Sequence, residues 1–189
     1  MNQPVVQRDK RRTAPIWIAL PLLAGGLWLG SNDTRDIIEK WESGGRRVLT
    51  AYADKLAGGL PTVCNGLTRH VTTAPIIVGE RWSDAKCEAH EAAVTHTVQR
   101  ELTKCFKRLP PQSVFDAASS HAWNFGVRKT CGSVSMQHWN RGEWGLGCAR
   151  LAYTAKYQPN WSHAGGQFYR GLHNRRKDEM RLCLKGLAK

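Results

Sequence analysis

The stretch from Thr13 to Gly30 contains no charged residue and directly follows a basic flank. The flank, residues 1–12, has three consecutive basic residues at Lys10–Arg12 and a fourth at Arg8, against one aspartate at position 9. A flank of this kind stays in the cytoplasm when a segment inserts into a membrane. We therefore expect a membrane segment at residues 13–30, with residues 31–189 facing the periplasm.

This segment is only weakly apolar. A bilayer takes about 17–25 apolar residues to cross, and Pro21, Gly25 and Gly26 lower the transfer free energy of a stretch already near that limit. Three outcomes are open: a permanent anchor, cleavage as a signal peptide after the small residues 24–26, or departure of the whole segment from the bilayer. Residues 27–29 extend the apolar run beyond the cleavage site, which argues against cleavage, and the weak apolarity of the segment would allow the whole of it to leave the bilayer.

The six cysteines include no CxxC pair, which argues against a zinc cluster or a thioredoxin-type redox motif. Disulfides fit an exported chain, whereas six reduced, buried cysteines of a cytosolic protein are the alternative. As a working guess among many connectivities we take Cys64–Cys87, Cys105–Cys131 and Cys148–Cys183. A different partner for Cys64 in a membrane-bound form is a second possibility.

The formal net charge of +13 favours a polyanionic partner, such as nucleic acid, anionic lipid or the acidic bacterial wall. The basic residues are scattered and no helix-turn-helix or RNP-like motif is present, so we expect no nucleic-acid partner. The seven histidines form no HxxH or HExxH pattern. We therefore expect no metal and no cofactor.

Hydrophobic spacing divides residues 31–189 into a helix, a short β-rich part and a series of helices, which predicts one α+β domain. Glycines and prolines interrupt short β-prone pieces between residues 48 and 78. The expected helices cover residues 32–42, 83–102 with Ser83 as the cap, 112–125, 133–140, 144–151 and 174–184.

The stretch from Trp41 to Thr68, WESGGRRVLTAYADKLAGGLPTVCNGLT, has the residue types needed to cleave a glycosidic bond. Such cleavage requires a carboxylic acid that protonates the leaving oxygen and a second group that manages the oxocarbenium-like centre or an attacking water. Glu42, at the end of the first expected helix, can supply the acid. Asp54, with Thr62 as a hydrogen-bonding partner, can hold the water.

This stretch resembles the phage lysozyme family typified by the T-even phages, glycoside hydrolase family 24. The family has a Glu at the end of its first helix, an Asp after an A-Y-x-D-like strand and a Thr that opens a T-x-x-x-G-x-T turn. Glu42, Asp54 and Thr62 match these positions. The segment HAWNFGV around Asn124 resembles the family's helix ending in N-x-G, and residues 165–176 resemble its G-G…G-L-x-x-R-R part.

The resemblance implies a lysozyme-like fold, with a small β lobe and a larger helical lobe on either side of a cleft, and it makes Asn124 a candidate substrate-binding residue. The chain departs from the family by two small insertions, around 43–47 and 57–61, which put Asp54 in more doubt than Glu42. Each residue also has an ordinary interpretation. Glu42 could be a solvated carboxylate, Asp54 a turn residue, Thr62 a strand residue and Asn124 part of a helix end.

Together with the N-terminal segment, the resemblance implies a signal-arrest-release endolysin: a lysozyme (N-acetylmuramoyl hydrolase) that moves from the host inner membrane to the periplasm. It would hydrolyse the glycan strands of peptidoglycan as a monomer and lyse the host cell. Two alternatives stay open. One is a lytic transglycosylase on the same substrate, and the other is a non-enzymatic, basic, membrane-anchored binding protein.

Overall fold

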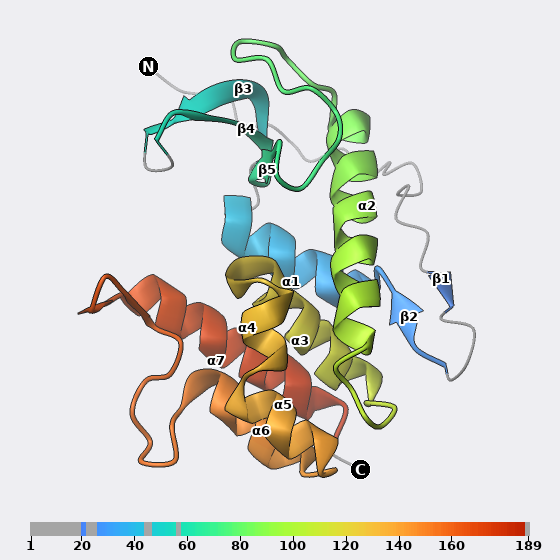
Figure 1. Ribbon diagram of the computed structural model, residues 1–189, viewed down its shortest axis with the longest axis vertical. Coiled ribbons are helices and arrows are strands. Elements are labelled where there is room, and N and C mark those ends of the chain that lie inside the picture. The colour runs from blue at the N-terminus through green and yellow to red at the C-terminus, as the bar shows by residue number, and fades with distance from the viewer. Residues whose placement is uncertain (1–19, 22–25, 44–46, 56–57, 188–189) are drawn as a thin grey trace, which may run out of the picture.

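The computed structural model describes residues 20–21, 26–43, 47–55 and 58–187 of the chain. These residues form a small β lobe and a larger helical lobe that are connected by one long helix (Figure 1). The helices are α1 (Asn32–Ser43), α2 (Asp84–Thr103), α3 (Gln112–Phe125), α4 (Val127–Cys131), α5 (Val134–Asn140), α6 (Trp144–Ala152) and α7 (Arg170–Lys185). The strands are β1 (Leu20–Pro21), β2 (Trp28–Leu29), β3 (Val48–Asp54), β4 (Leu60–Cys64), β5 (Leu67–Thr68), β6 (His163–Ala164) and β7 (Gln167–Phe168). The expected α+β architecture, with a small β lobe and a larger helical lobe, is confirmed.

The β lobe is an antiparallel sheet in the order β3-β4-β5. In the β3–β4 pair Tyr52 lies opposite Thr62 and Asp54 lies opposite Leu60, and a bulge between Val48 and Tyr52 shifts the register nearer the start of β3. The apolar face of this sheet packs on α2 and on the segment before it. The core of the lobe consists of Ala51, Val63, Cys64, Leu67, Trp82, Cys87 and Val94.

The helical lobe is built around α3, whose residues from Ser113 to Ala122 are all buried. α1, α2 and α7 all contact this helix. The apolar core of the helical lobe includes Leu102, Val114, Phe115, Met136, Trp139 and Leu151.

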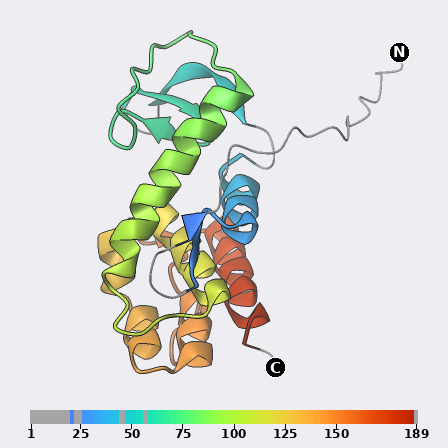
Figure 2. The same cartoon turned by 90° about the vertical axis from the view of Figure 1, so that its right-hand side faces the viewer.

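α2 connects the two lobes and belongs to both cores (Figure 2). Cys87 and Val94 of this helix belong to the core of the β lobe and Leu102, near its end, belongs to the core of the helical lobe, while Val98 packs against both clusters. The helix begins as the sequence predicts, since the Ser83 side chain accepts a hydrogen bond from the backbone N–H of Lys86 at 3.1 Å. A single helix in both cores fixes the lobes relative to one another.

Three disulfides are present, Cys64–Cys87, Cys105–Cys131 and Cys148–Cys183, the same pairs as in the working guess. The first attaches β4 to α2, the second attaches the segment after α2 to α4, and the third attaches α6 to α7. Each therefore crosslinks neighbouring elements of the fold, which lowers the conformational entropy of the unfolded chain.

Some elements differ from the sequence predictions. α7 begins at Arg170 and not near residue 174, because Gly171 in its first turn conceals the start from a propensity argument. The hairpin of β6 and β7 was not predicted; its two-residue turn, Gly165–Gly166, has positive φ at both positions, as a tight hairpin of this type requires. The five-residue helix α4 was missed because it is too short to show a period.

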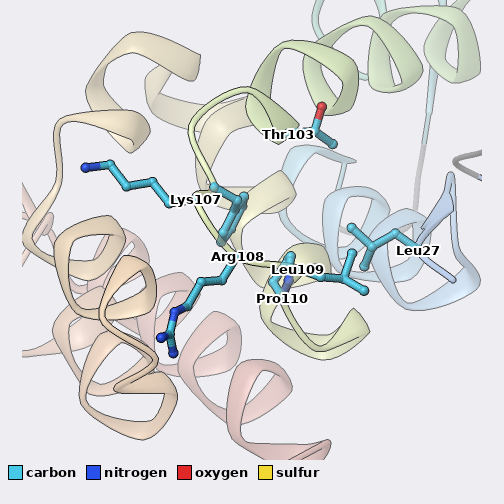
Figure 3. A pocket seen from close by; sticks show the side chains of 7 residues that line it. Leu27, Thr103, Lys107, Arg108, Leu109 and Pro110 are labelled. Atoms are coloured by element: carbon cyan, nitrogen blue, oxygen red, sulfur yellow. The ribbon is translucent and has the colours of Figure 1, made fainter. Parts of the chain in front are cut away.

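The end of the expected membrane segment is part of the folded domain. Leu27 and Leu29 are 4% and 3% exposed and belong to the core of the helical lobe. Leu27 also lines a cavity of about 220 Å³ together with the α2–α3 connection, where Figure 3 shows it beside Leu109 and Pro110. Burial of such a leucine contributes roughly 1.5–3 kcal/mol to folding.

Backbone hydrogen bonds hold the same residues in place. The Trp28 N–H donates to Gln112 Oε1 at 2.8 Å, Gln112 Nε2 donates to the Trp28 carbonyl at 3.0 Å, and the Gly30 N–H donates to buried Gln99 at 2.7 Å. Residues 13–19 and 22–25 of the expected segment lie outside the described residues. Within the part that the structure describes, no helix combines the length and the apolarity that a membrane span needs.

We predict that Leu29→Ala lowers the free energy of unfolding by about 2–5 kcal/mol, because it leaves a cavity in the core of the helical lobe. Urea unfolding of the purified chain measures this. Trp28→Ala is the control on the adjacent residue, whose side chain is 48% exposed, and it should cost clearly less. Equal losses for the two variants would contradict the docking of this segment into the core.

Candidate functional site

Glu42 lies in the last turn of α1, with its side chain 22% exposed at a cavity of about 510 Å³. The cavity is lined by residues of α1, α3, the β6–β7 hairpin and the start of α7: Trp41, Glu42, Asn124, Ala164, Tyr169, Arg170, Gly171, Leu172 and Arg175. This lining combines aromatic rings, one amide and charged groups, the mixture that suits a polar ligand such as a sugar.

An arginine fixes the carboxylate of Glu42. Arg175 Nη1 donates to Glu42 Oε1 at 2.5 Å, and the Arg175 side chain is only 4% exposed. A carboxylate at a helix C-terminus is disfavoured by the helix dipole, so the guanidinium also offsets that cost. The second oxygen, Oε2, faces the β lobe.

The turn between β4 and β5 approaches Glu42 from the β lobe. A Cβ atom at Gly66 would lie 4.0 Å from Glu42 Oε2, and Gly66 has a φ of +84°. Both the close approach and the left-handed backbone favour glycine at this position. The acid on α1 therefore faces the turn that follows Thr62, Val63 and Cys64.

α2 holds this turn at two neighbouring points. Cys87 is bonded to Cys64, and Glu91, one helical turn further on, accepts a hydrogen bond from the Asn65 N–H at 2.9 Å. Glu91 also pairs with Arg47 Nη2 at 3.1 Å, and both side chains are largely buried. Burial raises the pKa of Glu91, and the charge of Arg47 opposes that rise. Sequence reasoning missed this pair because its members lie far apart in the chain.

Asp54 and Thr62 lie on one face of the β3–β4 pair. Thr62 is opposite Tyr52, and Asp54 is two residues beyond Tyr52, so the alternation of strand side chains places both on the same side. Residues in this diagonal relation have Cα atoms about 7–8 Å apart. The sheet thus brings the two predicted residues together.

The hydroxyl of Thr62 donates its hydrogen to the backbone. Thr62 is 4% exposed and its Oγ1 donates to the carbonyl of Leu60 at 3.0 Å. A hydroxyl has one hydrogen to donate, so towards Asp54 or a ligand this oxygen acts as an acceptor. The catalytic roles of Asp54 and Thr62 stay predictions, as does a second disulfide partner for Cys64.

Asn124 lies in the same cavity as Glu42, although it comes from another helix. Its Oδ1 accepts a hydrogen bond from Arg176 Nη2 at 3.2 Å, and the end of α3 is formed two residues later by Gly126. The arginine therefore orients the amide so that its NH₂ group is the part available to a ligand. Contact with a sugar stays a prediction.

Arg176 and Glu179 also belong to the surroundings of the site. Both are fully buried, and Glu179 was not singled out from the sequence. The signal existed, because arginines at 175 and 176 and a glutamate at 179 have the spacing of ion pairs within one helix. Among the residues that the structure describes, no cluster of three or more metal-binding side chains is found.

His121 lies buried beneath this region on α3. Its Nδ1 bonds to Thr130 Oγ1 at 2.8 Å, and its ring packs edge-on against Trp161 and beside Phe125. Burial holds the pKa of His121 well below its ordinary value, and the charges of Arg176 and Arg175 lower it further. The imidazole is therefore neutral in the folded protein.

We predict that His121→Gln removes one component of the pH dependence of stability. The unfolded chain protonates this histidine below about pH 6.5, whereas the folded chain does not, so the wild type should lose about 1.4 kcal/mol per pH unit as pH falls below that value. Above it this contribution is fully present. Urea unfolding of both proteins at several pH values gives the two slopes, and identical slopes would contradict a neutral, buried His121.

The sequence and fold of this chain are similar to those of known phage proteins. A sequence model of the family "Phage lysozyme" matches residues 39–179, a range that includes Glu42, Asp54, Thr62, Asn124 and Glu179. Over 128 residues the chain is 29% identical to the SAR-endolysin of Enterobacteria phage P21, covering 68% of this chain and 71% of that protein.

Two solved structures have the same fold. The active form of the P1 phage endolysin Lyz gives a TM-score of 0.66 at 24% identity, over 84% of this chain and 86% of that one. The endolysin of Escherichia coli O157:H7 phage FAHEc1 gives 0.65 at 23% identity, over 85% and 95%. Because the family model covers most of the chain and includes every residue of the candidate site, the protein belongs to the phage lysozyme family.

Proposed function

We propose that this protein is an endolysin, a glycoside hydrolase that cleaves the glycan strands of bacterial peptidoglycan as a muramidase and thereby lyses the host cell. The observation that carries this proposal is the carboxyl group of Glu42, held by Arg175 at the cavity and opposite the β4–β5 turn. Membership of the phage lysozyme family and relatives that are themselves endolysins support it. The net charge of +13 suits an anionic cell wall.

Glu42 acts as the general acid. A guanidinium can only donate hydrogen bonds, so the proton of the acid belongs on Oε2 and not on Oε1, which Arg175 occupies. Oε2 is the oxygen on the side of the β4–β5 turn. A glycan strand bound between α1 and this turn would receive the proton on its glycosidic oxygen, and the bond to the anomeric carbon would break.

Asp54 and Thr62 position the attacking water. The carboxylate of Asp54 accepts a proton from this water, while the lone pairs of Thr62 Oγ1 accept its other hydrogen bond. Attack from the face opposite the leaving group inverts the anomeric centre, which requires a gap of roughly 6.5–9.5 Å between the two carboxyl groups. Asn124 would bind a sugar substituent through its amide NH₂. We expect the enzyme to act as a monomer.

We predict that Glu42→Gln lowers the rate of peptidoglycan cleavage by about 10²–10⁴-fold, because an amide cannot protonate the leaving oxygen. Turbidity loss of outer-membrane-stripped cells measures the rate. Asp36→Asn is the control: it changes an exposed acid on the same helix and should leave the rate within twofold or so of the wild type.

Near-normal activity of Glu42→Gln would remove the acid assignment. Mass spectrometry of the released muropeptides separates the two enzymatic readings, because a hydrolase gives reducing ends and a lytic transglycosylase gives anhydro sugars. Predominant anhydro products together with an active Asp54→Ala variant would favour the transglycosylase.

We further propose that the protein starts in the host inner membrane through residues 13–30 and is then released intact into the periplasm. Leu27, Leu29 and the backbone of Trp28 and Gly30 have partners inside the helical lobe, which they cannot reach while they lie in a bilayer. Ser31 and Thr34 add hydrogen bonds to buried Asp116 at 2.8 and 2.9 Å. These contacts favour the released state over a weakly apolar membrane state.

This proposal predicts that the periplasmic protein keeps its N-terminal segment. N-terminal sequencing of the periplasmic fraction should give a start before residue 13. Ala14→Leu with Ala19→Leu should increase the membrane-bound share of the protein, because both changes strengthen bilayer affinity without touching residues 26–30. A start after Gly26, or an unchanged distribution between membrane and periplasm, would contradict release of the intact chain.

A further inference from the structure

A buried network of charged groups lies behind Glu42. Glu179 Oε1 accepts hydrogen bonds from Arg176 Nη2 at 2.9 Å, from Arg175 Nε at 3.3 Å and from the Ser120 hydroxyl at 2.7 Å. One carboxylate oxygen therefore holds both arginines of α7 and connects them to α3. Arg175 also donates a hydrogen bond to Glu42, and Arg176 also donates one to Asn124.

The network is closed to solvent. The side chains of Arg176 and Glu179 are 0% exposed and that of Arg175 is 4% exposed. Burial lowers the pKa of Arg176 to about 10, so it stays a cation at neutral pH. Burial also raises the pKa of Glu179, and the charges of Arg176 and Arg175 oppose that rise.

Two buried cations and one buried carboxylate are a costly arrangement for stability alone. Apolar side chains of the same volume often replace a buried ion cluster without loss. In this protein, both arginines donate hydrogen bonds to residues of the candidate site, Arg175 to the acid Glu42 and Arg176 to the amide of Asn124. A role in that site explains the cluster better than a role in packing.

We propose that Glu179 is a positioning residue for glycan cleavage: it fixes Arg175 and Arg176, and through them it determines the position and electrostatic surroundings of the Glu42 carboxyl group and the orientation of Asn124. The inference rests on the proposed function, in which Glu42 must be protonated to act. Glu179 touches no substrate and acts through the two arginines.

The direction of the effect follows from charge. The positive charge of Arg175 lies against the Glu42 carboxyl group, and the negative charge of Glu179 partly offsets it. Without Glu179 the two positive charges act unopposed on a site that needs a neutral acid, so activity on the alkaline side should end at lower pH. Removal of a cation, as in Arg176→Gln, has the opposite effect. For partly buried charges at this separation the shift should be about one pH unit.

Other charged or titratable groups surround the network but remain unchanged in these variants. His121 on α3 is neutral, the Arg47–Glu91 pair lies behind the β4–β5 turn, the Lys40–Asp178 pair lies on the outer side of α1 and α7, and Arg170 lines the cavity from the first turn of α7. Their contributions cancel when variants are compared with the wild type.

The experiment measures the rate of cleavage of purified peptidoglycan against pH for the full chain isolated from the periplasm. In Glu179→Gln the alkaline limb of the profile, where the rate falls as pH rises, should shift to lower pH by about one unit. In Arg176→Gln it should shift to higher pH. Asp116→Asn is the matched control: it removes another buried carboxylate, but one bonded to Ser31 and Thr34 near the start of α1, so it should cost stability and leave the limb in place.

A limb that stays in place in Glu179→Gln, or that moves the same way in both variants, would overturn the proposal. If Glu179→Gln does not fold, Arg176→Gln alone tests the proposal: a shift of its alkaline limb to higher pH supports it, and an unchanged limb overturns it. The two levels of failure are distinguishable. An active Glu42→Gln enzyme removes the proposed acid itself, whereas an inactive Glu42→Gln with an unmoved limb in Glu179→Gln removes only the positioning role.

Discussion

The ion pair between Glu42 and Arg175 is the interaction on which the rest of the site depends. It connects the last turn of α1 to the second turn of α7, two segments far apart in the chain. A carboxylate at a helix C-terminus is unfavourable and tends to turn towards water. The buried guanidinium fixes it at the cavity instead, with one oxygen bonded and the other facing the β lobe.

The geometry across the cavity depends on α2. Because this helix is part of both cores, the β lobe has little freedom to move away from α1. Cys87 and Glu91 lie on one face of α2, and they hold Cys64 and the backbone of Asn65 next to the turn that faces Glu42. A disulfide and a buried carboxylate thus place the end of β4, and with it Thr62, relative to the acid.

Much of this arrangement follows from local sequence. The helical periods and the Ser83 cap predict the helices and put Glu42 at a helix end. The resemblance of the A-Y-x-D and T-x-x-x-G-x-T stretches to the phage lysozyme family implies that Asp54 and Thr62 lie in neighbouring strands. What could not be predicted depends on contacts between distant residues. The Arg47–Glu91 pair, the docking of Leu27 and Leu29 in the helical core, and the connection from Glu179 to Glu42 all require the tertiary fold.

The central claim is that the acid on α1 and the two residues on the sheet act on one glycan strand bound between them. A crystal structure of the Glu42→Gln variant with a peptidoglycan oligosaccharide tests this most directly. The account predicts a glycosidic oxygen within hydrogen-bonding distance of the amide of residue 42, with Asp54 and Thr62 on the opposite face of the adjoining sugar and Asn124 bonded to a ring substituent. A sugar chain bound elsewhere, or one that leaves Asp54 and Thr62 out of reach, would contradict it.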